Sequence, residues 1–199
     1  MVVNVHHFAE QIEEFLFKNH FLEEDVVISD ERELLLDTGG GLLKARSLFT
    51  PGESVLIHNV DILSDLNLRQ LIGFHQQNHY VATLVVRPSV PGRGLRFNEA
   101  GWLKGWENSC TGETKRVDAE FETAHNYSFC GIHIVSPELL KQMIHRGVFS
   151  IIDEYLAQQG YAVEDVFLRW FFLRFRYSRS YYSGRKMFTG LVGNCCNMA

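Results

Sequence analysis

Cysteine is scarce in this sequence, and its few copies form no recognisable metal or disulfide motif. Four cysteines occur among the 199 residues. They are Cys110, Cys130, Cys195 and Cys196, without a Cys-x-x-Cys pair, and two adjacent cysteines have poor geometry for a zinc knuckle. We therefore expect a reduced chain in the cytoplasm.

Long apolar runs and an excess of positive charge are absent as well. No segment approaches the roughly 20 apolar residues that span a membrane. Residues 1–7 lack the basic and apolar regions of a secretory signal peptide. The formal net charge is −5, and this mild acidity disfavours a nucleic-acid groove built on bulk charge. We expect a soluble protein that binds neither membranes nor nucleic acids.

Strand and helix patterns alternate through the first half of the chain. Hydrophobic residues make up 46% and charged residues 22% of the sequence, which is typical of a globular domain. Apolar runs predict strands over residues 2–5, 25–29, 54–58 and 80–86, with helices between them. This order predicts an α/β fold with a Rossmann-like, mostly parallel sheet and helices on both faces, because parallel strands are buried on both sides.

The second half of the chain has a different pattern. Segments 95–97 and 102–106 flank Asn-Glu-Ala-Gly and predict a small antiparallel hairpin region. Ser136, which precedes a proline, and Ser150 are expected to cap the starts of helices. From Val166 onward, arginine and large aromatic residues are mixed without a clear period of two or 3.6, so this segment shows little of the pattern expected of an enzyme's closing strand and helix.

Three consecutive glycines follow Asp37 and Thr38, between an expected strand and an expected helix. Each glycine in the run, Gly39, Gly40 and Gly41, costs about 0.5–1 kcal/mol of backbone entropy. We interpret them as a turn whose N–H groups approach a nucleotide base or ribose closely. The alternative is a flexible loop without a ligand.

Asp61 follows the expected strand 54–58, and Asn59 stands two residues before it. Mg²⁺ prefers carboxylate and phosphate oxygens, so Asp61 is a candidate metal ligand. The alternative is a cap for the helix that follows. Ligands of parallel sheets bind beyond the carboxyl ends of the strands. We therefore expect the glycine turn and Asp61 to meet at one rim of one sheet, within the length of a nucleotide.

Other reactive side chains have simpler interpretations. His6 and His7 are adjacent and share no helix face, so we expect structural positions or the edge of a site. Cys130 is expected to be a small buried core residue. Trp102 and Trp106 are expected to pack, although aromatic rims also line sugar pockets.

Three segments, in their order and spacing, resemble the sugar-1-phosphate nucleotidyltransferases. They read Leu-Leu-Asp-Thr-Gly-Gly-Gly at 35–41, His-Asn-Val-Asp-Ile-Leu at 58–63, and Phe-Cys-Gly-Ile-His-Ile-Val-Ser-Pro at 129–137. The group that they resemble most is the bacterial one that includes mannose-1-phosphate guanylyltransferase and N-acetylmuramate-1-phosphate uridylyltransferase. The resemblance covers about residues 1–160.

The resemblance implies a reaction and a set of roles. A sugar 1-phosphate attacks the α-phosphate of a nucleoside triphosphate, pyrophosphate leaves, and Mg²⁺ neutralises charge. The residues implied for the nucleotide are Thr38, Gly39, Gly40, Gly41 and Asn59. Asp61 is implied as the metal ligand and catalytic residue, while Gly131 and Glu107 are implied to contact the sugar.

The sequence also departs from this family. The family's first strand, its glycine-rich loop with an arginine, and its Lys-Pro pair are missing, as is a second metal-binding Asp near the end. We expect a chain truncated at its start, with a shifted reading frame after about Ala162, poorly soluble and inactive alone. Residues 1–163 are then a partial nucleotidyltransferase domain, and residues 164–199 lie outside the native fold.

Two other functions stay open. One is a non-catalytic nucleotide- or sugar-binding module that has lost its triphosphate loop. The other is a metal-dependent phosphohydrolase that uses Asp61 with Asp65 or Asp37 as a second carboxylate. The nucleobase, the sugar and the oligomeric state cannot be derived from the sequence.

Overall fold

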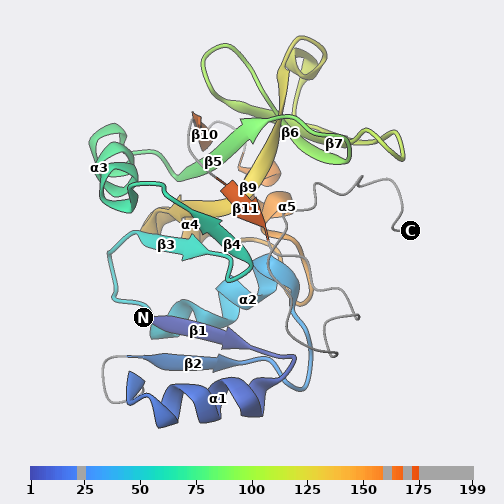
Figure 1. Cartoon of the computed structure of the whole chain (residues 1–199). Coiled ribbons are helices and arrows are strands. Elements are labelled where there is room, and N and C mark those ends of the chain that lie inside the picture. The colour runs from blue at the N-terminus through green and yellow to red at the C-terminus, as the bar shows by residue number, and fades with distance from the viewer. Residues whose placement is uncertain (22–25, 159–162, 168–171, 175–199) are drawn as a thin grey trace. The chain divides into compact units, whose positions relative to one another are not determined.

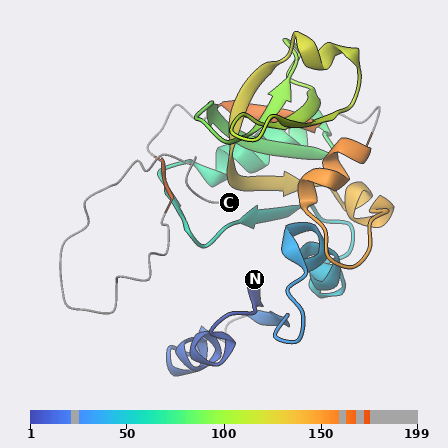
Figure 2. The same cartoon turned by 90° about the vertical axis from the view of Figure 1, so that its right-hand side faces the viewer.

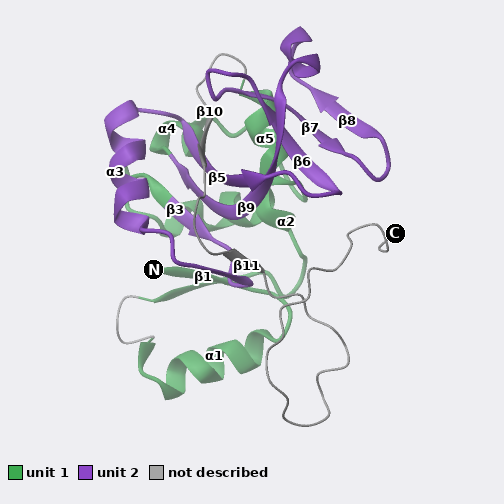
Figure 3. Cartoon of the chain, turned by 45° about the horizontal axis from the view of Figure 1, so that its top comes forward, with its two compact units in different colours: residues 1–55, 136–158 green, residues 56–135, 159–199 purple. Residues whose placement is uncertain are grey.

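The computed structural model describes residues 1–21, 26–158, 163–167 and 172–174. The chain divides into two compact units. The first combines Met1–Val55 with Ser136–Gln158, and the second is built mainly from Leu56–Val135 (Figure 3). The segment 136–158 thus belongs to the same unit as the N-terminal part of the chain.

The first unit contains two parallel strands and the helices that follow them. The strands are β1 (Val2–Val5) and β2 (Val27–Asp30), with Val2 opposite Val27. The helix α1 (Ala9–Lys18) connects them and lies alongside the pair (Figures 1 and 2). Such a crossover is required between parallel strands. Among the described residues, β1 and β2 pair with each other and with no third strand.

The first unit contains further helices among the described residues. They are α2 (Asp37–Ala45), η2 (Arg46–Leu48), α4 (Pro137–Gln142) and α5 (Ile151–Ala157). The Ser136 hydroxyl accepts the N–H of Leu139 at 3.2 Å, and the Ser150 hydroxyl accepts the N–H of Ile152 at 3.3 Å. Both predicted caps are therefore confirmed.

The second unit contains a larger, mixed sheet and one long helix. Its elements are β3 (Val55–His58), β4 (Ile62–Ser64), α3 (Leu68–Asn78), β5 (Ala82–Pro88), β6 (Arg93–Phe97), β7 (Leu103–Asn108), β8 (Glu113–Arg116), η3 (Ala119–Glu122), β9 (His125–Val135), β10 (Val163–Phe167) and β11 (Phe172–Arg174). The sheet order is β10-β5-β9-β6-β7-β8, with β3 also paired to β9. The predicted hairpin around residues 98–101 is confirmed as β6 and β7.

The long strand β9 organises this sheet. It pairs antiparallel with β6 near its start and antiparallel with β5 from Tyr127 to its end, and the strand bends along its course (Figure 2). Cys130, Ile132 and Ile134 of β9 pack with Val85 and Leu71 in a buried core. Burial of these apolar side chains is the main stabilising term of the unit.

The α/β class holds, but a mostly parallel sheet is not confirmed. The pairs β1–β2 and β10–β5 are parallel, whereas β5–β9, β6–β9, β6–β7, β7–β8 and β4–β11 are antiparallel. Residues Ala82–Val86 of β5 are all buried. A strand buried on both faces is apolar whichever way its neighbour runs, so its pattern cannot indicate direction.

The segment that begins at residue 164 is described only in part. The strand β10 pairs with β5 through Val163–Phe167, and β11 pairs with β4. Residues 168–171 and 175–199 lie outside the described residues, so the expected two-part division at residue 163 stays a prediction. No helix in the described ranges is long and apolar enough to cross a membrane.

Candidate functional site

The three glycines lie inside a helix and not in a turn. Helix α2 begins at Asp37, and its buried residues include Gly39, Gly40 and Gly41. The left-handed backbone conformation belongs to Asp37, with φ of 60°. The predicted glycine turn is therefore wrong. Glycine has a low helix propensity, and the reason it occurs here is packing.

Each glycine allows another part of the first unit to approach the helix axis. A Cβ at Gly39 would overlap the ring of Phe149, and one at Gly40 would overlap the carbonyl oxygen of Gly147. A Cβ at Gly41 would lie 2.7 Å from the Nδ2 atom of Asn4. The run of glycines thus makes α2 thin enough for residues 147–149 to pack directly against its backbone.

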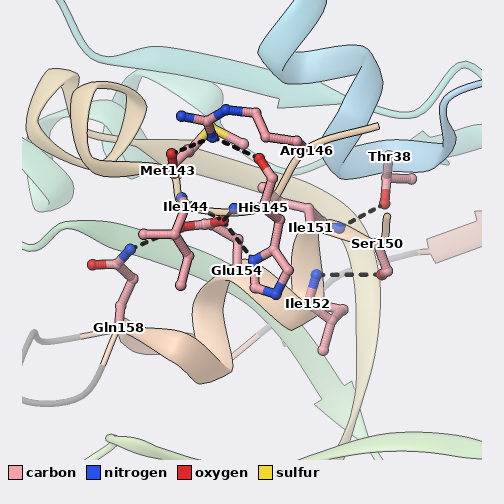
Figure 4. A network of polar contacts seen from close by, with 10 residues as sticks. All are labelled: Thr38, Met143, Ile144, His145, Arg146, Ser150, Ile151, Ile152, Glu154 and Gln158. Carbon is pink, nitrogen blue, oxygen red and sulfur yellow. Dashed lines mark hydrogen bonds and ion pairs between the residues drawn. The ribbon is translucent and has the colours of Figure 1, made fainter. Parts of the chain in front are cut away.

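The N–H groups at the start of α2 already have protein partners. The N–H groups of Gly39 and Gly40 donate to the carbonyl oxygen of Phe149, at 2.9 and 3.2 Å. The N–H of Thr38 donates to the Asp37 carboxylate at 2.6 Å. The Thr38 hydroxyl accepts the N–H of Ile151 at 3.0 Å (Figure 4). The expectation that these N–H groups are open to a ligand is not met in this structure.

A hollow of about 480 Å³ lies beside the start of α2, within the first unit. It is lined by Asn4, His6, Glu31, Leu35, Asp37, Thr38 and Val148. Of the predicted nucleotide residues, Thr38 lines it directly. These side chains come from the ends of β1 and β2, the start of α2 and the connection between α4 and α5, so the hollow lies beyond the carboxyl ends of two parallel strands.

The buried carboxylate of Glu31 bonds to residues on one side of the hollow. Glu31 is 4% exposed. It accepts the Nδ2 proton of Asn4 at 2.7 Å and the N–H of Leu36 at 3.0 Å. The His6 Nδ1 atom lies 2.7 Å from the Glu31 carbonyl oxygen. Asn4 and Glu31 were not predicted from the sequence. The available signals were that Asn4 is a polar residue within an apolar strand and that Glu31 is a carboxylate directly after a second strand.

Two of the predicted site residues come together in the second unit. The N–H of Asn59 donates to the carbonyl oxygen of Gly131 at 3.0 Å. Gly131 has φ of 73°, which disfavours any side chain, and a Cβ there would lie 2.7 Å from the Nδ2 atom of Asn59. The carboxamide of Asn59 therefore covers the backbone of Gly131.

Asp61 lies in the turn between β3 and β4 and is half-buried. The cap of the following helix α3 is Asn67, whose side-chain oxygen accepts N–H groups from Arg69 and Gln70 at 3.1 and 3.2 Å. This excludes the interpretation of Asp61 as the helix cap. Within the described ranges, no three His, Cys, Asp or Glu side chains form a metal-binding group.

Glu107 on β7 is tied to its neighbours. Its Oε2 atom accepts hydrogen bonds from Nε of Arg96 at 2.8 Å and lies 2.7 Å from the Nη2 atom, while Oε1 accepts from Asn126. Arg96 also donates to the carbonyl oxygen of Ala124 and lies 5.0 Å from the ring centre of Phe121. The carboxylate therefore connects β7 with the strands β6 and β9 in this structure.

The remaining candidates behave as structural residues. Cys130 is 1% exposed, and burial raises the pKa of its thiol to about 12, which confirms a core position without nucleophilic character. Trp106 packs under the ammonium group of Lys115 at 5.5 Å, whereas Trp102 is 42% exposed. His6 lines the hollow, and the ring of His7 contacts that of Phe8 in a tilted arrangement.

The predicted site residues are divided between the units. Thr38 and the glycines 39–41 lie in the first, while Asn59, Asp61, Glu107 and Gly131 lie in the second. The idea that the two groups meet at one rim stays a prediction.

Known proteins resemble this chain in sequence and in structure. No family model matches it. The catalytic subunit beta of mannose-1-phosphate guanylyltransferase from Drosophila pseudoobscura pseudoobscura is 27% identical over 176 residues. The match covers 82% of this chain and 44% of the relative, so the chain spans less than half the length of this curated protein.

Solved structures show the same fold at low sequence identity. HddC from Yersinia pseudotuberculosis superposes with a TM-score of 0.66 and 15% identity, over 87% of this chain and 71% of its own. A putative glucose-1-phosphate thymidylyltransferase from Bacillus anthracis superposes with a TM-score of 0.66 and 10% identity, over 87% and 69%. The fold is thus the α/β fold of nucleotidyltransferases. In sequence and in fold, the chain distantly resembles the sugar-1-phosphate nucleotidyltransferases.

Proposed function

We propose that this chain carries the substrate-binding parts of a sugar-1-phosphate nucleotidyltransferase. In that reaction a phosphate oxygen of the sugar 1-phosphate bonds to the α-phosphorus of a nucleoside triphosphate. The bond to the β-phosphate breaks, giving a nucleoside diphosphate sugar and pyrophosphate. The observation that carries the proposal is the hollow at the start of α2, where the glycine motif stands beyond the carboxyl ends of two parallel strands.

The nucleotide end of the site is proposed at this hollow. Its volume of about 480 Å³ is in the range of small-molecule pockets. Thr38 presents its side chain to the ligand, together with Asn4 and His6. The glycines 39–41 do not contact the ligand in this proposal; they allow the segment that carries Val148 to pack against α2 and so to line the hollow. HddC has also been solved in complex with GMP-PN, which supports a nucleotide as the ligand.

The sugar end is proposed in the second unit, at Gly131. Gly131 has no Cβ, and the carboxamide of Asn59 therefore lies directly against its backbone, where the amide can bond a hydroxyl group of the sugar. Asn59 was expected on the nucleotide side, but its contact with Gly131 associates it equally with the sugar. Glu107 contributes a carboxylate that Arg96 holds in one orientation.

Asp61 is proposed as the Mg²⁺ ligand. Mg²⁺ is commonly held by one or two carboxylates together with substrate phosphates and water, so one half-buried carboxylate fits a site that the substrates complete. When bound, the ion neutralises charge on the phosphates that react. The chain's own contribution is to orient the two substrates.

One observation favours a second candidate, a binding module without catalysis. The described residues around the hollow include two carboxylates, Glu31 and Asp37, and no lysine or arginine. A triphosphate needs cationic or N–H partners, and this wall offers few of them. The hollow by itself therefore suits a base and ribose better than a triphosphate.

Product formation separates the two candidates. The chain is incubated with GTP, mannose 1-phosphate and Mg²⁺, and GDP-mannose is measured by chromatography. Enzyme function predicts a product whose formation Asp61→Asn abolishes, while the matched exposed variant Asp65→Asn retains it. Binding of GTP without any product supports the module. If Asp65→Asn and Asp61→Asn are equally inactive, the role assigned to Asp61 alone is wrong.

A further inference from the structure

The carboxylate of Glu154 does not line the hollow, but it bonds to the chain segment that does. Glu154 on α5 is fully buried. Burial raises its pKa, but hydrogen bonds from His145, Ile144 and Gln158 outweigh that effect and lower it below the usual range, so the group is ionised. A buried carboxylate is stable only when its oxygens have several donors.

The donors come mostly from the connection between α4 and α5, residues 143–150, here called the strap. The Ile144 N–H lies 3.1 and 3.2 Å from the two oxygens, and the His145 N–H lies 3.2 Å from Oε2. The His145 Nδ1 atom lies 2.8 Å from the same oxygen, and Gln158 donates to Oε1 at 2.9 Å (Figure 4). One carboxylate thus holds the first part of the strap in place.

The other part of the strap is fixed to α2. The carbonyl oxygen of Phe149 accepts from Gly39 and Gly40, and its N–H donates to the carbonyl oxygen of Leu36 at 3.2 Å. The ring of His145 stacks on that of Phe149, with centroids 5.3 Å apart. Between these two anchors lies Val148, which lines the hollow.

We infer that Glu154 is a positioning residue for the nucleotide end of the site, acting through the strap; this rests on the proposed function of the hollow. Glu154 does not line the hollow. It sets where Val148 and Phe149 lie, and Phe149 in turn binds the N–H groups next to Thr38. A glutamine in its place exchanges one acceptor oxygen for an NH₂ donor, which opposes the donors of Ile144 and His145.

The test compares two ligands that the proposal assigns to different units. Binding of GTP and of mannose 1-phosphate is measured by calorimetry for the natural chain, Glu154→Gln and the exposed control Glu138→Gln. We expect GTP binding to weaken about tenfold in Glu154→Gln, as loss of hydrogen bonds to a charged group predicts, with mannose 1-phosphate binding unchanged. Glu138→Gln should bind both ligands like the natural chain.

Each other outcome has a defined meaning. If Glu154→Gln is folded and binds GTP like the natural chain, the positioning role is wrong while the proposed function stands. If both ligands weaken equally, Glu154 has a general structural role and the inference fails. If the natural chain binds no GTP, both proposals fail.

A second variant covers the case in which Glu154→Gln does not fold. His145→Ala removes one side-chain donor at a partly exposed position and leaves the buried carboxylate with its other donors. It should weaken GTP binding and speed amide exchange at residues 148–150. Unchanged GTP affinity in this variant would overturn the inference.

Discussion

Replacement of Gly40 by alanine sets two opposing effects against each other. Alanine favours a helix over glycine by about 1 kcal/mol, so helix propensity alone predicts stabilisation. At Gly40, however, the new Cβ would overlap the carbonyl oxygen of Gly147 and lie 2.9 Å from the Cβ of Leu36. The strap cannot retreat easily, because Phe149 is bonded to α2. Overpacking costs about 1–3 kcal/mol, and two overlaps, one of them with a backbone atom, place Gly40→Ala in the upper part of that range. After the propensity gain of about 1 kcal/mol is subtracted, we expect net destabilisation of about 1–2 kcal/mol.

The control is a helical glycine without neighbours. Gly73 lies in α3, and a Cβ there meets nothing within 4 Å. Gly73→Ala should therefore stabilise the chain by about 1 kcal/mol. Thermal unfolding followed by circular dichroism should show a melting temperature lowered by several degrees for Gly40→Ala, at about 2–4 °C per kcal/mol, and raised for Gly73→Ala. If both variants are stabilised, the glycines do not serve close packing and the account of the strap is wrong.

Three further outcomes are expected. Gly131→Ala should destabilise the second unit by about 1–3 kcal/mol in urea unfolding, since φ is 73° and Asn59 would lie against the new methyl group. A further Asn59→Gly substitution should restore part of the lost stability, and no restoration would contradict the contact between Asn59 and residue 131. Burial lowers the pKa of His133 to about 3, so the folded state keeps the imidazole neutral. The free energy of unfolding should therefore be highest above about pH 6.5, where the unfolded state is neutral too, and should fall by up to about 1.4 kcal/mol per pH unit below pH 6.5. A free energy of unfolding that does not change between about pH 7 and 5 would refute this. Glu107→Gln should lower the free energy of unfolding by about 2–3 kcal/mol, because it removes the negative charge that pairs with Arg96. An equal loss in an Arg96→Leu background would show that the pair is not coupled.

Much of the local structure could be predicted from the sequence. The caps at Ser136 and Ser150 are short-range hydrogen bonds, and the β6–β7 hairpin depends on the Asn-Glu-Ala-Gly turn, so residues close in sequence determine both. The burial of Cys130 follows from the apolar residues around it. These features depend on the chain within a few residues.

The features that were missed depend on distant parts of the chain. The glycines were interpreted as a turn because nothing in residues 37–41 shows that Phe149 packs on them. The donors of Glu154 and the contact between Asn59 and Gly131 are likewise set by the fold. The antiparallel pairing of β5 with β9 was missed for a related reason, because the apolar character of a strand does not indicate the direction of its neighbour.

The hollow beside α2 is the proposed place of nucleotide binding, and filling it with a larger side chain tests that proposal directly. Leu35 lines the hollow and is 56% exposed, while its neighbour Leu34 is 57% exposed and does not line it. Calorimetric titration of GTP into Leu35→Trp should show binding lost or strongly weakened, because the indole fills the hollow without removing a hydrogen bond, whereas Leu34→Trp should bind like the natural chain. Equal GTP affinity in both variants would contradict nucleotide binding at the hollow.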